Sequence, residues 1–235
     1  MARDLNVDPA ELEKFNELAH RWWDRDGEFR PLHEINPLRL GWIDRQAPLA
    51  GKTALDVGCG GGILTEAMAR LGANATGIDL GEKALAVARI HANQVGANVR
   101  YEAVSAEDFA QAHSQEFDVV TCMELLEHVP EPPSTVQACA RLAKPGGRIF
   151  FSTINRNPKA YLFAVVGAEY VLKLLPKGTH DYARFIKPSE LTRWCRDAGL
   201  RPLEMIGMTY NPLTKQYRLT GNCDVNYLLC CAKDG

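Results

Sequence analysis

The chain has 235 residues, of which 46% are hydrophobic and 24% charged, so it can bury one sizeable core and needs no second one. Its formal net charge of −2 excludes the overall basic field that recruits nucleic acid, and no stretch reaches the roughly 20 apolar residues that cross a bilayer. Seven cysteines without a C-x-x-C pair indicate reduced core thiols, so we expect a cytoplasmic protein. From the length and the charge we expect a single domain over 1–235 with no nucleic-acid partner.

The first 50 residues predict helices that cover the ligand site. A helix-start signal stands at Asp8-Pro9-Ala10-Glu11. Bulky aromatic side chains follow it at Phe15, Trp22, Trp23, Phe29 and Trp42. We expect most of them to pack in the core and the rest to cover a bound ligand.

Strands and helices alternate over 51–154. Short apolar runs predict strands at 52–57, 74–79, 98–104, 117–122 and 147–153, and helical periodicity predicts helices at 62–71, 82–95, near 106 and at 133–143. This order implies parallel strands joined by right-handed crossovers, hence a Rossmann-like, doubly wound α/β sheet. Ligands of such sheets bind at the carboxyl ends of the strands, which is where Gly58, Asp79, Ser105 and Glu124 fall.

The C-terminal part divides into an apolar insertion, 155–187, and a final unit, 188–235. Residues 160–175 carry only Glu169 and Lys173 as charges, which leaves a wide apolar helix face. This segment could contact an anionic membrane through 156–177, as a peripheral attachment to the inner membrane, or could be an ordinary lid over the active site. A helix is predicted at 188–198, followed by strands at 201–209 and 224–231 that could pair as an antiparallel hairpin at the sheet edge.

The most informative stretch is Ala-Leu-Asp-Val-Gly-Cys-Gly-Gly-Gly at 54–62. Its glycines permit positive φ and leave backbone N–H groups open to a ligand. Gly58, Gly60 and Gly62 read G-x-G-x-G, whereas a dinucleotide fingerprint needs G-x-G-x-x-G. Asp79, about 20 residues further on, can accept hydrogen bonds from both ribose hydroxyls. The pattern therefore predicts a nucleoside cofactor without a 2′-phosphate.

Other short motifs accompany this turn, namely Phe117-Asp118-Val119-Val120, Leu126-Glu127-His128-Val129 and Leu142-Ala143-Lys144-Pro145-Gly146-Gly147. Together with the glycine turn and Asp79 they resemble the class I S-adenosylmethionine-dependent methyltransferases. That resemblance implies a doubly wound sheet, mostly parallel, with an antiparallel C-terminal strand, N-terminal helices and S-adenosylmethionine as methyl donor.

Stretches outside the cofactor fold extend the resemblance over nearly the whole chain. They include Arg21-Trp22-Trp23-Asp24, Thr121-Cys122-Met123-Glu124 and Asp224-Val225-Asn226-Tyr227, and they resemble the ubiquinone-biosynthesis O-methyltransferases. The acceptor implied by this family is a polyprenylated catechol or demethylubiquinol, methylated on a ring hydroxyl.

The resemblance also implies which residues contact the cofactor. Arg39 would bind the methionine carboxylate, Gly58 and Gly60 would allow close backbone approach, Asp79 would bind the ribose, and Met123 would offer an apolar contact. From the residues alone, Arg39 fits a surface arginine equally well, and Met123 fits a core methionine. Glu107 or Asp108 could bind the adenine amino group or simply begin a helix in water.

Methyl transfer to a phenol needs an anionic oxygen, because a phenol titrates near pH 10. Glu124, Glu127 and His128 form the one local group that could act as base or could hold a magnesium ion. The resemblance to eukaryotic relatives implies the metal role, whereas the same Leu-Glu-His-Val tetrapeptide resembles that of many class I methyltransferases that use no metal. A purely structural turn is the third interpretation. His180 and Asp181 form a second pair, which as a loop pair is more often a surface hydrogen bond.

Two other functions fit the sequence. One is a methyltransferase for a small soluble phenol, which has no need of the apolar insertion. The other is a non-catalytic protein that binds S-adenosylmethionine, against which stands the number of acids and histidines near the strand ends.

Overall fold

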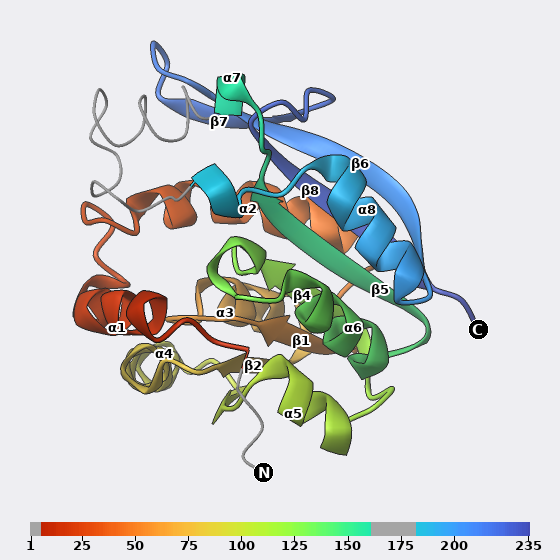
Figure 1. Ribbon diagram of the computed structural model, residues 1–235. Coiled ribbons are helices and arrows are strands. Elements are labelled where there is room, and N and C mark those ends of the chain that lie inside the picture. The colour runs from red at the N-terminus through yellow and green to blue at the C-terminus, as the bar shows by residue number, and fades with distance from the viewer. Residues whose placement is uncertain (1–5, 161–181) are drawn as a thin grey trace.

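The computed structural model describes residues 6–160 and 182–235, which contain one eight-stranded sheet in the order β3-β2-β1-β4-β5-β8-β6-β7 (Figure 1). The strands are β1 (Thr53–Val57), β2 (Asn74–Asp79), β3 (Val99–Ala103), β4 (Phe117–Met123), β5 (Ala143–Ile154), β6 (Leu200–Asn211), β7 (Gln216–Thr220) and β8 (Asn226–Lys233). The first five strands are parallel, which confirms the predicted doubly wound sheet.

Helices cover both faces of the sheet (Figure 1). They are α1 (Pro9–Leu18), α2 (Arg30–Gln46), α3 (Ile63–Arg70), α4 (Glu82–Val95), α5 (Ala106–Ala112), α6 (Pro132–Leu142), α7 (Pro158–Ala160) and α8 (Pro188–Asp197), with short 3-10 helices η1 (Ala19–Arg21), η2 (Leu126–His128) and η4 (Tyr182–Arg184). Buried side chains of α5, α6 and α8 form one core with the sheet, and those of α2 and α3 form another on the opposite face.

Helix boundaries follow local chemistry that is visible in the sequence. α1 begins after Asp8, whose carboxylate accepts a hydrogen bond from the Ala10 amide at 2.9 Å. α5 begins after Ser105, whose hydroxyl accepts one from the Asp108 amide at 3.1 Å. α4 ends at Val95 and is capped by Gly96, which has a φ of +67°. These capping residues explain why the predicted helix starts at 8–9 and near 106 are correct.

The C-terminal strands differ from the predicted edge hairpin. β6 and β8 are antiparallel neighbours, as predicted, but β8 lies inside the sheet between β5 and β6. The hairpin at the sheet edge is formed by β6 and β7, and β7 is missing from the prediction. Its residues, Gln-Tyr-Arg-Leu-Thr, are all at least partly exposed, so no apolar run marks it.

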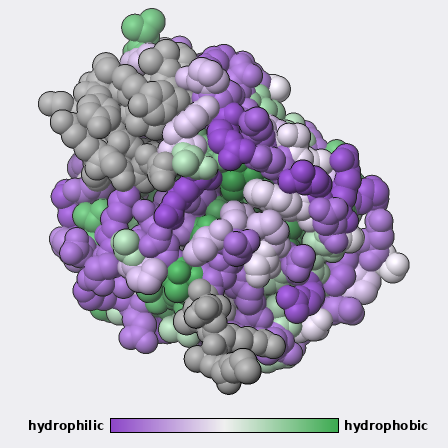
Figure 2. Space-filling view, in the orientation of Figure 1, coloured by the Kyte–Doolittle hydropathy of each residue, from purple (hydrophilic) through white to green (hydrophobic). Residues whose placement is uncertain are grey.

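Most cysteines are buried, and the surface visible in Figure 2 is largely hydrophilic. All seven cysteines are unpaired, and six of them are buried. On the face that carries α5, α6 and α8, Figure 2 shows apolar residues scattered among hydrophilic ones. None of the helices in the described ranges is long and apolar enough to span a bilayer. The apolar segment 161–175, with Glu169 and Lys173, and the pair His180 and Asp181 lie outside the described residues.

Candidate active site

The glycine turn connects the end of β1 to the start of α3. Gly58, Gly60 and Gly62 have φ values of +71°, +51° and +84°, which L side chains rarely adopt. A Cβ on Gly60 would lie 2.1 Å from the Trp22 ring, and one on Gly58 would lie 2.8 Å from Leu125. Both the backbone conformation and the packing therefore require glycine at these positions.

Asp79 ends β2 beside this turn and fixes its shape. One carboxylate oxygen accepts a hydrogen bond from the Gly60 amide at 2.9 Å, and the other accepts one from the Gly81 amide at 2.7 Å. Burial raises the pKa of Asp79, while these amide hydrogen bonds oppose the rise. The carboxylate is thus held rigidly at the edge where β1 and β2 end.

Asp56 supports the same edge from inside the protein. It is 3% exposed and accepts hydrogen bonds from the Thr65 hydroxyl at 2.7 Å and the Thr121 hydroxyl at 2.8 Å. Burial raises its pKa to about 6, although both hydroxyls favour the ionised form. Asp56 therefore ties β1 to α3 and to β4.

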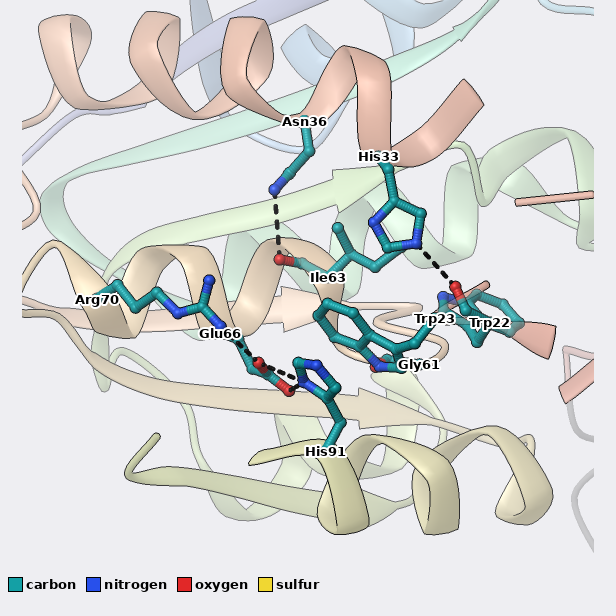
Figure 3. A network of polar contacts seen from close by, with 9 residues as sticks. All are labelled: Trp22, Trp23, His33, Asn36, Gly61, Ile63, Glu66, Arg70 and His91. Carbon is teal, nitrogen blue, oxygen red and sulfur yellow. Dashed lines mark hydrogen bonds and ion pairs between the residues drawn. The ribbon is translucent and has the colours of Figure 1, made fainter. Parts of the chain in front are cut away.

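Figure 3 shows how the N-terminal segment is fastened to the glycine turn. The Trp23 indole stacks on the His91 imidazole, with ring centroids 3.3 Å apart and planes 7° apart, and its N–H donates to the Gly61 carbonyl at 3.0 Å. His91 Nδ1 lies 2.9 Å from both carboxylate oxygens of Glu66. Burial raises the pKa of Glu66, and the His91 contact opposes this. The turn is thereby enclosed between α3, α4 and the segment that follows η1.

Helix α2 adds two contacts to this network (Figure 3). His33 Nε2 lies 2.9 Å from the Trp22 carbonyl, and Asn36 donates to the Ile63 carbonyl at 3.4 Å. Burial lowers the pKa of His33 and so favours the neutral ring, whose Nε2–H donates to the carbonyl. Trp22 also stacks on Phe29, with centroids 4.0 Å apart.

Glu124 follows β4 in an unusual backbone conformation, with a φ of +53°. Its amide donates to the Ser152 carbonyl at 3.1 Å, and the Ser152 hydroxyl donates to its carboxylate at 2.7 Å. The same carboxylate pairs with the guanidinium of Arg39, which is 5% exposed. This ion pair joins α2 to the end of β4.

Glu127 and His128 lie on η2 and have different partners. Glu127 is 4% exposed and accepts a hydrogen bond from the Thr153 hydroxyl at 2.8 Å; burial, and next the Glu124 charge, raise its pKa to about 7. His128 Nδ1 lies 2.7 Å from a carboxylate oxygen of Glu11 in α1. Burial lowers the pKa of His128, but the hydrogen bond to Glu11 and the negative charges of Glu127 and Glu11 together outweigh burial, so the pKa is raised.

A cavity of about 980 Å³ lies at the carboxyl ends of β1, β2 and β4. Eight residues that the sequence analysis assigns to the cofactor, catalysis or a metal line it, namely Arg39, Gly58, Gly60, Asp79, Met123, Glu124, Glu127 and His128. Ser105 and Glu107 also line it, whereas Asp108 turns to Ser105 and Gln111. The opposite wall is formed by Met208, Tyr210 and Tyr217 of β6 and β7.

The magnesium role of Glu124, Glu127 and His128 gains no support from their positions. Each side chain is directed to its own partner, which is Arg39, Thr153 or Glu11 respectively. Across the two described ranges, no three His, Cys, Asp or Glu side chains are grouped so that they could hold a metal ion. The magnesium site therefore stays a prediction.

Several residues of the site were not singled out from the sequence. Glu11 and Asn6 reach it from the N-terminus, Ser152 from β5 and Asn226 from β8. The short motif Asp224-Val225-Asn226-Tyr227 is the one signal that could have pointed to Asn226. The others have no local pattern, because their contacts are made by residues far apart in the chain.

The parallel sheet, the glycine turn and the fixed carboxylate of Asp79 define a class I S-adenosylmethionine-dependent methyltransferase. A model of the methyltransferase domain family matches residues 32–205. The chain is 69% identical to the ubiquinone biosynthesis O-methyltransferase of Thiobacillus denitrificans, over 97% of this chain and 99% of that protein. It is 64% identical to the enzyme of the same name from Pseudomonas syringae pv. tomato, over 95% and 97% of the two chains. The chain belongs to the family of ubiquinone biosynthesis O-methyltransferases, and its methyl donor is S-adenosylmethionine.

Solved structures agree on the fold. A methyltransferase from Thermotoga maritima matches with a TM-score of 0.67 and 17% identity, over 96% of this chain and 99% of that one. The magnesium protoporphyrin IX methyltransferase of Synechocystis, solved with bound SAH, matches with a TM-score of 0.65 and 19% identity, over 98% and 90%.

Proposed function

We propose that the chain transfers a methyl group from S-adenosylmethionine to a ring hydroxyl of a polyprenylated catechol or demethylubiquinol. The observation that carries this proposal is the cavity, because it joins a nucleoside-type end at Gly58, Gly60 and Asp79 to an apolar and aromatic end at Met208 and Tyr210. Ligand pockets commonly measure about 300–1,000 Å³. At about 980 Å³ this cavity is large enough for a donor and a ring acceptor together.

The donor end fits S-adenosylmethionine in charge and shape. Asp79 would bind the ribose hydroxyls, the glycine turn would admit the nucleoside, and Met123 would supply an apolar contact. Arg39 offers a further sign of a ligand, since its Nε is buried and has no hydrogen-bond partner among the described residues. A ligand carboxylate would satisfy this N–H group. When bound, the donor supplies a methyl group on a positively charged sulfur.

The acceptor oxygen must lose its proton, and we infer that His128, which lines the cavity, receives it. Glu11 accepts the hydrogen bond from Nδ1, which leaves Nε2 as the ring atom that can take a proton. Glu11 is a positioning residue, since it holds the ring and stabilises its charged form. Glu124 would contribute by contact with the acceptor, because its carboxylate lines the same cavity.

Labelled methyl transfer to a short-chain prenylated catechol tests the function. We expect transfer by the parent protein and an increase in the KM for S-adenosylmethionine of about tenfold or more in Asp79→Ala, since charged hydrogen bonds contribute about 1.5–3 kcal/mol. Asp197→Ala, an exposed position in α8, serves as the matched control. Binding of S-adenosylhomocysteine without transfer to any prenylated catechol would leave a soluble phenol as the acceptor or make the chain a non-catalytic binding protein.

A second assay tests the magnesium role separately. Full activity after thorough chelation would remove the metal role of Glu124, Glu127 and His128. Loss of activity that added magnesium restores would support it.

We also infer that residues 156–177 contact an anionic membrane, because the proposed acceptor partitions into lipid. Arg156 pairs with Glu190 and Lys159 pairs with Asp224. The sequence adds two further cations to this stretch, Lys173 and Lys177, which lie outside the described residues. Co-sedimentation with phosphatidylglycerol vesicles should be lost in Phe163→Glu and Val166→Glu while the protein stays folded. Absence of binding by the parent would contradict this inference.

A further inference from the structure

Among the described residues, Asn226 is one of the cavity-lining residues with a buried side-chain atom that has no hydrogen-bond partner. The side-chain Oδ1 of Asn226 is buried and accepts no hydrogen bond within the part of the chain that the structure describes. Buried polar atoms of folded proteins are almost always paired, so each exception needs an explanation. Asn226 lines the same cavity as Glu124 and Arg39, so a ligand in this cavity would lie next to the Asn226 side chain.

The orientation of the Asn226 amide is fixed by Glu124. Its Nδ2 donates to Glu124 Oε1 at 3.4 Å. A carboxylate can only accept hydrogen bonds, so the reversed amide would place two oxygens against each other. Glu124 is itself held by Arg39 and by the Ser152 hydroxyl. The Asn226 oxygen must therefore face away from Glu124.

The topology of the sheet explains why Asn226 reaches the site. β8 runs antiparallel to β5 and β6, so its first residue lies at the edge where the parallel strands end. Asn226 pairs in register with Ile154 on one side and with Met208 on the other, and both neighbours line the cavity. The amide is thus a polar group set between two apolar walls.

We propose that Asn226 Oδ1 accepts a hydrogen bond from the acceptor hydroxyl that is not methylated. This inference rests on the proposed function, because a catechol carries two neighbouring hydroxyls. The reacting oxygen gives up its proton, whereas its neighbour keeps an O–H donor that needs an acceptor where the cavity wall is apolar on both sides of Asn226. Asn226 is then a specificity-determining residue that selects rings with a free hydroxyl next to the reacting one.

The test compares two acceptors in two proteins. The acceptors are a short-chain prenylated catechol and the phenol that lacks only the second hydroxyl, and the proteins are the parent and Asn226→Ala. We expect Asn226→Ala to lower kcat/KM for the catechol by about 10- to 100-fold and to leave the phenol unchanged within about twofold. Dissociation constants of both rings for the protein loaded with S-adenosylhomocysteine give the same comparison if the phenol reacts too slowly.

Controls separate this role from a structural one. Asn93→Ala makes the same substitution at an exposed position of α4 and should change neither acceptor. Thermal unfolding and affinity for S-adenosylhomocysteine should be unchanged in Asn226→Ala. An equal loss for both acceptors, or no loss for the catechol, would overturn the inference, whereas failure of the parent to methylate any catechol would overturn the proposed function instead.

Discussion

At the scale of single residues, the glycine turn shows how backbone conformation and packing act together. Gly60 has a positive φ, and the Trp22 ring occupies the space that a Cβ would need. Gly96 has a positive φ as well, but a Cβ added there would meet no atom within 4 Å. Alanine at Gly96 therefore tests the effect of the positive φ alone, whereas alanine at Gly60 tests that effect together with the clash with Trp22.

We expect Gly60→Ala to weaken S-adenosylhomocysteine binding at least tenfold and to destabilise the fold more than Gly96→Ala does. An L residue in the left-handed conformation costs roughly 1–2 kcal/mol, so the free energy of unfolding should fall by about this amount in both variants. Calorimetric titration and urea unfolding measure the two effects. Equal behaviour of the two variants would show that contact with Trp22 does not constrain the turn.

Asp56 makes stability depend on pH, because its pKa is about 6 when folded and 3.8 ordinarily. Between these values the folded protein binds the proton more readily than the unfolded chain, so the contribution of Asp56 to stability falls as the pH rises through this window. Asn at this position carries no charge to bury.

The free energy of unfolding of Asp56→Asn, measured relative to that of the parent, should therefore rise by about 2–3 kcal/mol from pH 4 to pH 7.5, because each pKa unit corresponds to about 1.4 kcal/mol. Urea unfolding of both proteins at the two pH values measures this difference. A stability difference that does not change with pH would count against a raised pKa.

At the scale of elements, α1 has no buried residue, yet it supplies the partner of His128. Glu11 and His128 are 117 positions apart, so neither amphipathic periodicity nor a local motif could predict this contact. Glu11→Gln should lower kcat about tenfold or more, because the ring loses its anionic partner. The dissociation constant of S-adenosylhomocysteine should stay within about twofold, and a loss confined to that constant would contradict the positioning role.

The stack of Trp23 on His91 joins the N-terminal segment to α4 (Figure 3). Trp23→Ala should destabilise the protein by about 3 kcal/mol, near the lower end for tryptophan truncation because the ring is only partly buried. Trp23→Phe keeps a stacking ring and loses the N–H donor to Gly61, so it should cost only about 1 kcal/mol. Similar losses in both variants would assign the stabilisation to the hydrogen bond.

At the scale of the whole molecule, the parallel half of the fold was predictable because short apolar runs alternate with stretches of helical periodicity over 51–154. β7 was not, since Gln216–Thr220 has no buried residue, and the place of β8 between β5 and β6 follows from sheet pairing rather than from its own sequence. The cavity residues near the glycine turn were predictable from spacing. Glu11 and Asn226 were not, because Glu11 contacts a residue 117 positions away and Asn226 contacts one 102 positions away.

Binding of S-adenosylhomocysteine should slow amide hydrogen exchange in both parts of the molecule that enclose the cavity. We expect protection in α1 and in 58–62, which both contribute to the wall, and no change in α8, which contributes no residue to it. Protection limited to 58–62 would mean that α1 does not close over the donor.

The position of β8 has a consequence for synthesis of the protein. This strand follows β6 and β7 in the chain, yet it separates β5 from β6 in the sheet and carries Asn226 to the site. While the chain is still on the ribosome, β5 must keep an open edge and the β6–β7 hairpin has no sheet to join. Premature termination near residue 225 would therefore release a polypeptide that contains β1 to β7 but leaves the edge of β5 exposed. Such a product should aggregate or be degraded, and it would lack one wall of the active site.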